Sequence, residues 1–159
     1  MTSPTKSPKI GFTVYGGSAA LKFEPTVTEG GSPTLLIEAA RGQPNNYEWG
    51  EKIVFQVTAR ELAPFLACIF GWAPSFAATN HGQGNKSLAL ENQLAEGRIF
   101  CRVTEGSNRT AVPIGPSDAF NIGRLGLEQL ALSSKCTLHD TLEILRLTTG
   151  RLLHHHQKI

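Results

Sequence analysis

The sequence predicts a single α+β domain in which antiparallel sheets pack with helices. The chain has 159 residues, which is the size of one domain with a substantial core. Segments typical of strands follow one another in runs instead of alternating with helices, and such runs favour antiparallel sheets. The strand-to-helix passages VFQVTARELAPFL and AVPIGPSDAFNIGRL are also alike. Either a unit of strands followed by a helix is duplicated, or the likeness is due to chance.

The first half of the chain contains three segments with the character of strands. GFTVYGGSAALKFEP (11–25) is rich in β-formers, and its Gly16-Gly17 pair indicates a bulge or a close backbone approach. TLLIEAA (34–40) is an apolar run typical of a buried strand, and KIVFQVT (52–58) alternates. Thr58 and Glu61 then form a capping box that opens a helix. Pro64 must bend this helix or delay its start.

The second half predicts a loop, a hairpin, a further strand and two helices. The loop over 71–85 is made of small and turn-forming residues. Helix periodicity is weaker in the first of the two helices, which contains two glycines, than in the amphipathic second one. The predicted ranges are 86–92 and 97–105 for the hairpin, 108–114 for the strand, and 117–134 and 137–153 for the helices.

The ends of the chain and its cysteines predict an intracellular protein. Residues 1–9 have no apolar segment of a secretory signal and predict a disordered arm, followed by one domain over 10–153 and a tail over 154–159. No apolar run approaches the roughly 20 residues that span a bilayer. Three cysteines without a CxxC pair indicate reduced thiols, so we expect a cytoplasmic location and no membrane partner.

No pattern of catalytic, metal-binding or cofactor-binding residues is present. The sequence lacks the phosphate-loop, GxSxG and HExxH motifs. His81 is interpreted as an exposed loop residue, and His139 as a surface residue. Three consecutive histidines, 154–156, cannot all face one metal on a helix, and Cys68 fits a small core position. We therefore expect neither catalysis, nor a metal, nor a cofactor.

The charge and the aromatic residues are compatible with a ligand that is held partly by stacking. The formal net charge of +2 is too small to indicate a duplex-binding protein on its own. Single-stranded nucleic acid is held by ring faces and by cations, and each stacked base contributes roughly 1–3 kcal/mol. The candidate rings on predicted strands are Phe12, Tyr15, Phe23, Phe55 and Phe100, and the candidate cations are Lys22, Arg41, Lys52, Arg98, Arg102 and Arg109.

The stretch GRIFCRV places an aromatic ring between two cations. Arg98, Phe100 and Arg102 have the same parity in the strand and therefore project from one sheet face, while the residues between them face the core. This row suits a base and its phosphates. The alternative is a solvated sheet face with one exposed phenylalanine.

The stretch NNYEWGEKIVF (45–55) places Tyr47 and Trp49 in a turn, next to Lys52. The two rings either line a binding surface or form a small cluster under the turn. We favour a packing role on the sheet for Trp49.

Several motifs resemble those of the plant organelle Whirly proteins, a family that binds single-stranded DNA. That family carries a KGKAAL motif running into Glu-Pro, an apolar strand ending in small residues, and Tyr-Asp-Trp. A Lys follows three residues on, a Phe three further, and then a Thr-x-x-Glu helix start. The matching positions here span about 50 residues and are Gly16 to Leu21, Glu24-Pro25, Tyr47-Glu48-Trp49, Lys52, Phe55 and Thr58 to Glu61.

The resemblance implies two packed antiparallel four-stranded sheets, crossed like whirligig blades, with helices that mediate a homotetramer. It implies that single-stranded DNA runs along the sheet edges and between subunits with little sequence preference. Gly16 and Ser18 depart from the motif because they replace its two lysines, which reduces the expected positive charge of that edge. The missing transit peptide suits a prokaryotic or phage-type relative.

We therefore expect a non-enzymatic, single-stranded-DNA-binding homotetramer. RNA is the alternative ligand, because nothing in the sequence reads a 2′-hydroxyl. An oligomeric interaction scaffold without a nucleic-acid ligand is the alternative of another class. The predicted binding residues are Tyr15, Lys22, Phe23, Arg41, Tyr47, Trp49, Lys52, Arg98, Phe100 and Arg102.

Overall fold

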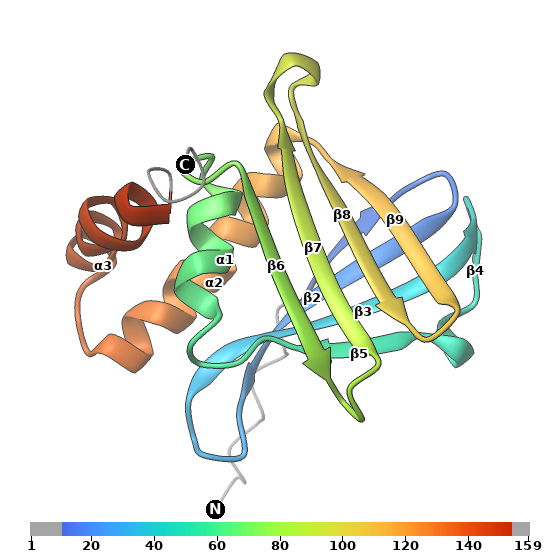
Figure 1. The fold of residues 1–159 in the computed structure, drawn as a ribbon, viewed down its shortest axis with the longest axis horizontal. Helices are drawn as coiled ribbons and strands as arrows, with labels where there is room; N and C mark the ends of the chain where they lie inside the picture. Colours follow the sequence, from blue (N-terminus) through green and yellow to red (C-terminus); the bar gives the residue numbers. More distant parts are fainter. Residues whose placement is uncertain (1–10, 154–159) are drawn as a thin grey trace, which may run out of the picture.

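The computed structural model describes residues 11–153 as two antiparallel sheets and three helices (Figure 1). The arm predicted over 1–9, the tail predicted over 154–159 and the three consecutive histidines lie outside the described residues. The first sheet has the order β1-β2-β3-β5, and a two-residue strand, β4, pairs with the far end of β3. Its elements are β1 (Phe12–Tyr15), β2 (Ala19–Val27), β3 (Pro33–Gln43), β4 (Asn46–Tyr47), the 3-10 turn η1 (Trp49–Glu51) and β5 (Ile53–Gln56).

Both halves of the chain pass through the strands of one sheet and then into a helix, with five strands in the first half, counting the short β4, and four in the second. The second sheet has the order β6-β7-β8-β9, and α1 and α2 each follow the last strand of their sheet. The α+β class with two packed antiparallel sheets is therefore confirmed. The elements are α1 (Leu62–Ile69), β6 (Ser75–His81), β7 (Lys86–Gln93), η2 (Leu94–Glu96), β8 (Arg98–Glu105), β9 (Asn108–Ile114), α2 (Pro116–Ser134), α3 (Leu138–Leu145) and the π-helical turn η3 (Arg146–Gly150).

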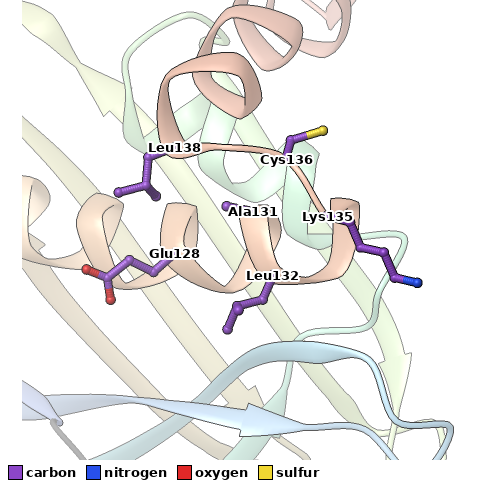
Figure 2. A pocket seen from close by; sticks show the side chains of 6 residues that line it. All are labelled: Glu128, Ala131, Leu132, Lys135, Cys136 and Leu138. Carbon is purple, nitrogen blue, oxygen red and sulfur yellow. The ribbon is translucent and has the colours of Figure 1, made fainter.

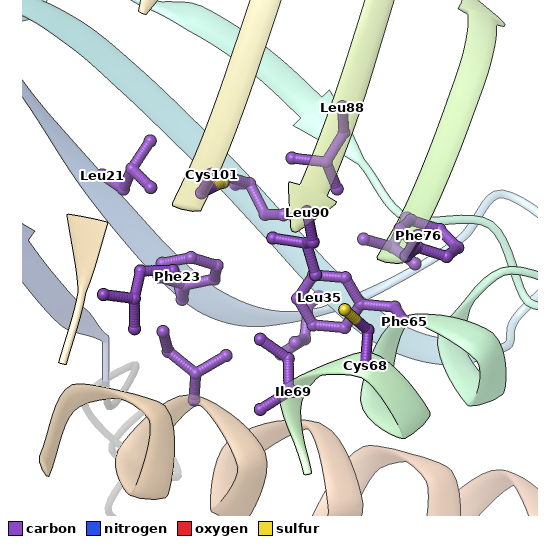
Figure 3. Close-up of a cluster of buried hydrophobic side chains, with 14 of the residues drawn as sticks. Leu21, Phe23, Leu35, Phe65, Cys68, Ile69, Phe76, Leu88, Leu90 and Cys101 are labelled. Carbon is purple, nitrogen blue, oxygen red and sulfur yellow. The ribbon is translucent and has the colours of Figure 1, made fainter. Parts of the chain in front are cut away.

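The two sheets cross each other, and the helices gather at one side of them (Figure 1). One apolar core joins both sheets and the helices, since alternate residues of each strand turn inward. Figure 3 shows side chains from three layers meeting there. They include Leu21, Phe23 and Leu35 from the first sheet, Phe76, Leu88, Leu90 and Cys101 from the second, and Phe65, Cys68 and Ile69 from α1.

Helix α2 docks through small and polar residues. A Cβ atom added at Gly126 would lie 2.5 Å from a methyl carbon of Leu66 in α1, so the two helices approach too closely for a side chain there. Gln129 is buried and donates hydrogen bonds of 2.9 Å to the carbonyl oxygens of Thr26 and Thr34. These bonds satisfy groups near the turn that joins β2 to β3, and they fix α2 over the first sheet.

A capping box forms in the turn that leads into α1, and α1 itself begins after it. The Thr58 backbone N–H donates to Glu61 Oε1 at 2.9 Å, and the Glu61 N–H donates to Thr58 Oγ1 at 3.2 Å, which is the predicted capping box. Pro64 delays the start: the helix runs from Leu62, so the proline stands in the first turn, where its missing N–H needs no partner.

Three local predictions were wrong. Residues 75–81 form strand β6, not part of a loop. Residues 11–25 form two strands, β1 and β2, instead of one, and Gly16-Gly17 lies in the turn between them, where the Gly16 N–H donates to the Ala19 carbonyl at 2.8 Å. Of the two alternatives for this glycine pair, the close backbone approach is the correct one, because a Cβ atom on Gly16 would lie 2.9 Å from the Ala19 carbonyl oxygen. His81 is not an exposed loop residue: its Nε2 lies 2.8 Å from Glu61 Oε2, and its ring stacks on Phe55 with centroids 4.0 Å apart.

Candidate functional site

Strand β8 presents a row of cations and an aromatic ring on the outer face of the second sheet. Arg98 and Arg102 are exposed and Phe100 is half-buried, while the intervening Ile99 and Cys101 are in the core. The alternation predicted from the sequence is thus confirmed. Neighbouring side chains of such a row stand about 7 Å apart along the strand.

The guanidinium groups lie close to the ring of Phe100. The Cζ atom of Arg102 is 5.1 Å from the ring centroid and that of Arg98 is 6.0 Å from it, which is cation–π range. Across the sheet Arg102 pairs with Ala89 and Ala111. Because both neighbours are small, the arginine projects beyond the surface around it, whereas Phe100 pairs with Glu91 and Pro113 and is half-buried.

The charges of this row differ in how far they are neutralised. Arg98 Nη2 lies 2.9 Å from Glu96 Oε2, and Arg98 Nε donates to Gln93 Oε1 at 2.7 Å. Arg102 has no ion pair with any residue from 11 to 153, and the same holds for Arg109 on β9. The end of the row beyond Phe100 is therefore the more electropositive one.

Arg102 and Arg109 open onto one hollow of about 470 Å³ at the junction of the two sheets. Arg109 pairs with Thr104 and shares the outer sheet face with Arg102. Ser18, from the turn between β1 and β2, lines the hollow from the side of the first sheet. The complete lining is Ser18, Arg102, Thr104, Gly106, Arg109, Thr110 and Ala111.

Two tyrosines form an aromatic pair at the neighbouring edge of the first sheet. The ring centroids of Tyr15 and Tyr47 are 5.8 Å apart with an interplanar angle of 35°. Tyr47 is held by its hydroxyl, which donates to the Gly16 carbonyl at 2.6 Å, whereas Tyr15 is 70% exposed. With Pro44 and Asn45 the pair lines a hollow of about 370 Å³, so its rings are accessible from solvent.

Three further predicted binding residues lie close to Tyr47 in the sequence: Arg41, Trp49 and Lys52. Trp49 begins η1 and is half-buried. Arg41, near the end of β3, is exposed and forms no ion pair within the described part of the chain. Lys52 is exposed, but its Nζ lies 2.8 Å from Glu38 Oε2.

One of the predicted binding residues is buried, and another is already ion-paired. Phe23 has no exposed surface and belongs to the core, so it offers no ring face to a ligand, and that prediction is corrected. Lys22 turns to the outer face, where its Nζ lies 2.6 Å from Glu24 Oε1. The hydrogen bond to Glu24 raises the pKa of the Lys22 ammonium, which stays charged but is already paired.

The turn over residues 16–18 connects the two groups of predicted residues. Ser18 lines the hollow that contains Arg102 and Arg109, and its carbonyl accepts the Gly42 N–H at 3.0 Å. The Gly16 carbonyl accepts the Tyr47 hydroxyl. The turn therefore contacts both the hollow beside the β8 row and the tyrosine pair.

Sequence reasoning named Arg109 as a candidate cation but left it out of the predicted binding residues, and it did not bring Ser18 into the site. A signal for Arg109 was available, because a two-residue turn at Gly106-Ser107 pairs Glu105 with Asn108 and thereby fixes the face of every β9 residue. No comparable signal existed for Ser18, since its approach to β9 depends on how the two sheets pack.

A third hollow, of about 550 Å³, lies where α2 passes into α3 (Figure 2). Leu132 and Leu138 are exposed there by 65% and 49%. Phe120, Ile144, Leu147 and Leu152 are also exposed apolar residues of the helical segments. Glu128 and Lys135 line the same hollow, so the exposed apolar residues of the helices stand among charged ones.

No metal site or membrane helix is found in the described part of the chain. Residues 11–153 contain no group of three His, Cys, Asp or Glu side chains that could hold a metal ion. None of the described helices is long and apolar enough to cross a membrane.

The fold is similar to that of a solved plant protein. The crystal structure of WHY1 from Arabidopsis thaliana matches with a TM-score of 0.61 and 17% sequence identity, over 81% of this chain and 93% of the other. This likeness shows a Whirly-like fold. No protein-family model matches the chain, and no curated protein matches it either.

Proposed function

We propose that this protein binds single-stranded nucleic acid, DNA in the first place, with little sequence specificity. The observation that carries the proposal is the Arg98–Phe100–Arg102 row, in which two guanidinium groups flank one accessible ring on an outer sheet face. Every base has a π-face, so stacking on such a row does not depend on which base is present.

The division of labour within the row follows from its contacts. Phe100 and the planar guanidinium of Arg102 provide surfaces on which bases stack, and the charge of Arg102, which no described carboxylate pairs, attracts a phosphate. Arg98 contributes less net charge because Glu96 already pairs with it. The net attraction is therefore modest, in keeping with a formal charge of only +2.

The edge of the first sheet extends the same surface. Tyr15 adds a second exposed ring, supported by Tyr47, and Arg41 adds an exposed cation. Two likenesses support the proposal. The fold is Whirly-like, and the motif resemblance over Gly16 to Glu61 implies single-stranded DNA as the ligand. The same resemblance implies a homotetramer, and we propose self-association through the helical side.

An interaction scaffold without a nucleic-acid ligand is the second candidate. It is favoured by the ion pairs of Lys22, Lys52 and Arg98, which neutralise three of the five cations predicted to bind. Arg102 and Arg41 count against it, because both are exposed and neither is ion-paired within residues 11–153, so their charges are open to a ligand.

Fluorescence anisotropy tests the proposal directly. Labelled single-stranded DNA, duplex DNA and single-stranded RNA of equal length are titrated with the protein at two salt concentrations. We expect tighter binding of the single strands than of the duplex, weakening as salt rises. The ratio of the DNA and RNA affinities identifies the preferred ligand. Absence of binding to all three at low salt would refute the proposal and favour the interaction scaffold.

A further inference from the structure

The hollow between the two sheets has the composition of an anion site. Two arginines, Arg102 and Arg109, line it together with the exposed Ser18, and no carboxylate is among its lining residues. The acidic residue nearest to them in the hairpin, Glu105, has its Oε2 3.4 Å from Lys86 Nζ. Nothing within residues 11–153 therefore neutralises the two guanidinium groups by an ion pair.

Two like charges that share a hollow repel each other, and an anion between them removes this repulsion. A guanidinium presents a planar fork of N–H donors that fits the oxygen atoms of a phosphate. Thr104 is not free to compete, because its hydroxyl is hydrogen-bonded to that of Ser87. Ser18 is exposed at the rim and can add a hydroxyl donor.

The position of the hollow relative to the aromatic residues points to a backbone phosphate. Phe100 is the next residue along the outer face of β8 from Arg102. On the other side, Gly16 of the same turn as Ser18 accepts the hydroxyl of Tyr47. Surfaces for stacking a base thus lie on both sides of a place that suits one phosphate.

We infer that Arg102 and Arg109 hold a single backbone phosphate at the point where a bound strand crosses from the second sheet to the first. The strand stacks on Phe100 before the crossing and on Tyr15 after it. This inference rests on the proposed function, and it adds Arg109 and Ser18 to the binding surface and a path for the strand.

The test measures how binding depends on salt for two probes: an oligothymidylate and an oligomer of equal length with abasic sites throughout. The slope of log Kobs against log salt becomes shallower by about 0.7 for each phosphate of a single strand that the protein no longer neutralises. We expect this change for Arg109→Gln with both probes, because the interaction involves no base. Phe100→Ala should weaken the oligothymidylate only.

Two variants control for charge and for folding. Arg109→Lys keeps the charge and should retain the wild-type slope. Arg124→Gln removes one positive charge from α2, on the helical side, and should leave the slope unchanged. A thermal melt of each variant verifies that it is folded.

The outcomes separate the inference from the function on which it rests. If the wild type binds single strands but Arg109→Gln keeps the full slope, the phosphate site is wrong and the proposed function remains. If the wild type binds neither probe, the phosphate site and the proposed function are both wrong. Inorganic phosphate alone is the third arm: if it raises the melting temperature of the wild type but not of Arg109→Gln without displacing DNA, the hollow belongs to a free anion and the strand path is overturned.

Discussion

At the scale of single residues, the ring of Phe100 distinguishes a binding face from an ordinary sheet face. We expect Phe100→Ala to weaken binding of single-stranded DNA by roughly 5- to 150-fold, since one stacked base contributes roughly 1–3 kcal/mol. The melting temperature should change little, because the side chain is only half-buried. Anisotropy titrations and a thermal melt measure the two effects.

Phe23→Ala is the matched comparison on the other sheet. Its ring is fully buried, so the substitution should lower the free energy of unfolding by about 3–5 kcal/mol while the affinity of the folded fraction stays the same. If Phe100→Ala behaved like Phe23→Ala, Phe100 would be a packing residue and the stacking interpretation would be refuted.

The three thiols differ in their surroundings and should differ in reactivity. Burial raises the pKa of Cys68 and of Cys101 to about 12, and Cys68 contributes a smaller electrostatic effect on Cys101. At pH 8 their thiolate fractions are therefore very small, whereas Cys136 is exposed. A chromogenic disulfide reagent should react rapidly with one thiol in the native protein and with three in denaturant. Rapid reaction of a second native thiol would contradict the burial of this pair.

At the scale of elements, the close crossing of α1 and α2 requires a glycine, Gly126, although glycine is unfavourable within a helix. Gly126→Ala improves helix propensity by about 1 kcal/mol, but its Cβ would collide with the buried Leu66. Overpacking of this kind costs about 1–3 kcal/mol, so we expect a lower free energy of unfolding in spite of the better propensity.

Asn121→Ala provides the control for propensity on the same helix. Asn121 lies outside the buried stripe, and its side-chain amide bonds to the Ser117 carbonyl one turn earlier. Urea denaturation should show equal or greater stability for this variant and reduced stability for Gly126→Ala. If Gly126→Ala were also more stable than the wild type, α1 and α2 could move apart enough to accept the added Cβ atom, and the overpacking argument would be refuted.

Elements with their own periodicity or capping could be predicted from the sequence. β8 was recognisable because Ile99, Cys101 and Val103 alternate with residues of the outer face and because a hairpin partner lies next to it. The turn that leads into α1 was readable from Thr58 and Glu61, although the helix itself begins only at Leu62. In contrast, β6 consists largely of small and polar residues and is a strand because it pairs with β7, which local propensity does not reveal.

The candidate site could be predicted only in part. Lys22 and Phe23 are adjacent in one strand, so they must face opposite sides, and assigning both to the binding surface was inconsistent with strand geometry. The Arg98–Phe100–Arg102 row needed only the period of one strand. Its connection to Ser18 and the tyrosines needed the packing of the two sheets, which no local pattern encodes.

At the scale of the whole molecule, the cationic face and the exposed apolar residues of the helices suggest separate tasks. If subunits associate through the helices, light scattering should give about four times the chain mass of 17.2 kDa. Leu132→Glu combined with Leu138→Glu should reduce that mass, because charges would then have to be buried in the subunit contact. Both side chains are exposed in one chain, so its own stability should hardly change.

Phe120→Glu tests whether the contact extends along α2, since Phe120 is exposed near the start of that helix. A mass of one chain for the wild type would contradict the tetramer. An unchanged mass for the double variant would place the subunit contact elsewhere.

The strict alternation of β8 also limits how this surface can change during evolution. Inserting or deleting one residue inside the strand, just after Arg98, would turn every later side chain of the strand to the opposite face. Arg102 would then enter the core, and Cys101 and Val103 would leave it. Lineages descended from this chain can therefore remodel the face by exchanging single amino acids, while length changes are restricted to the turns, such as the one at Gly106-Ser107.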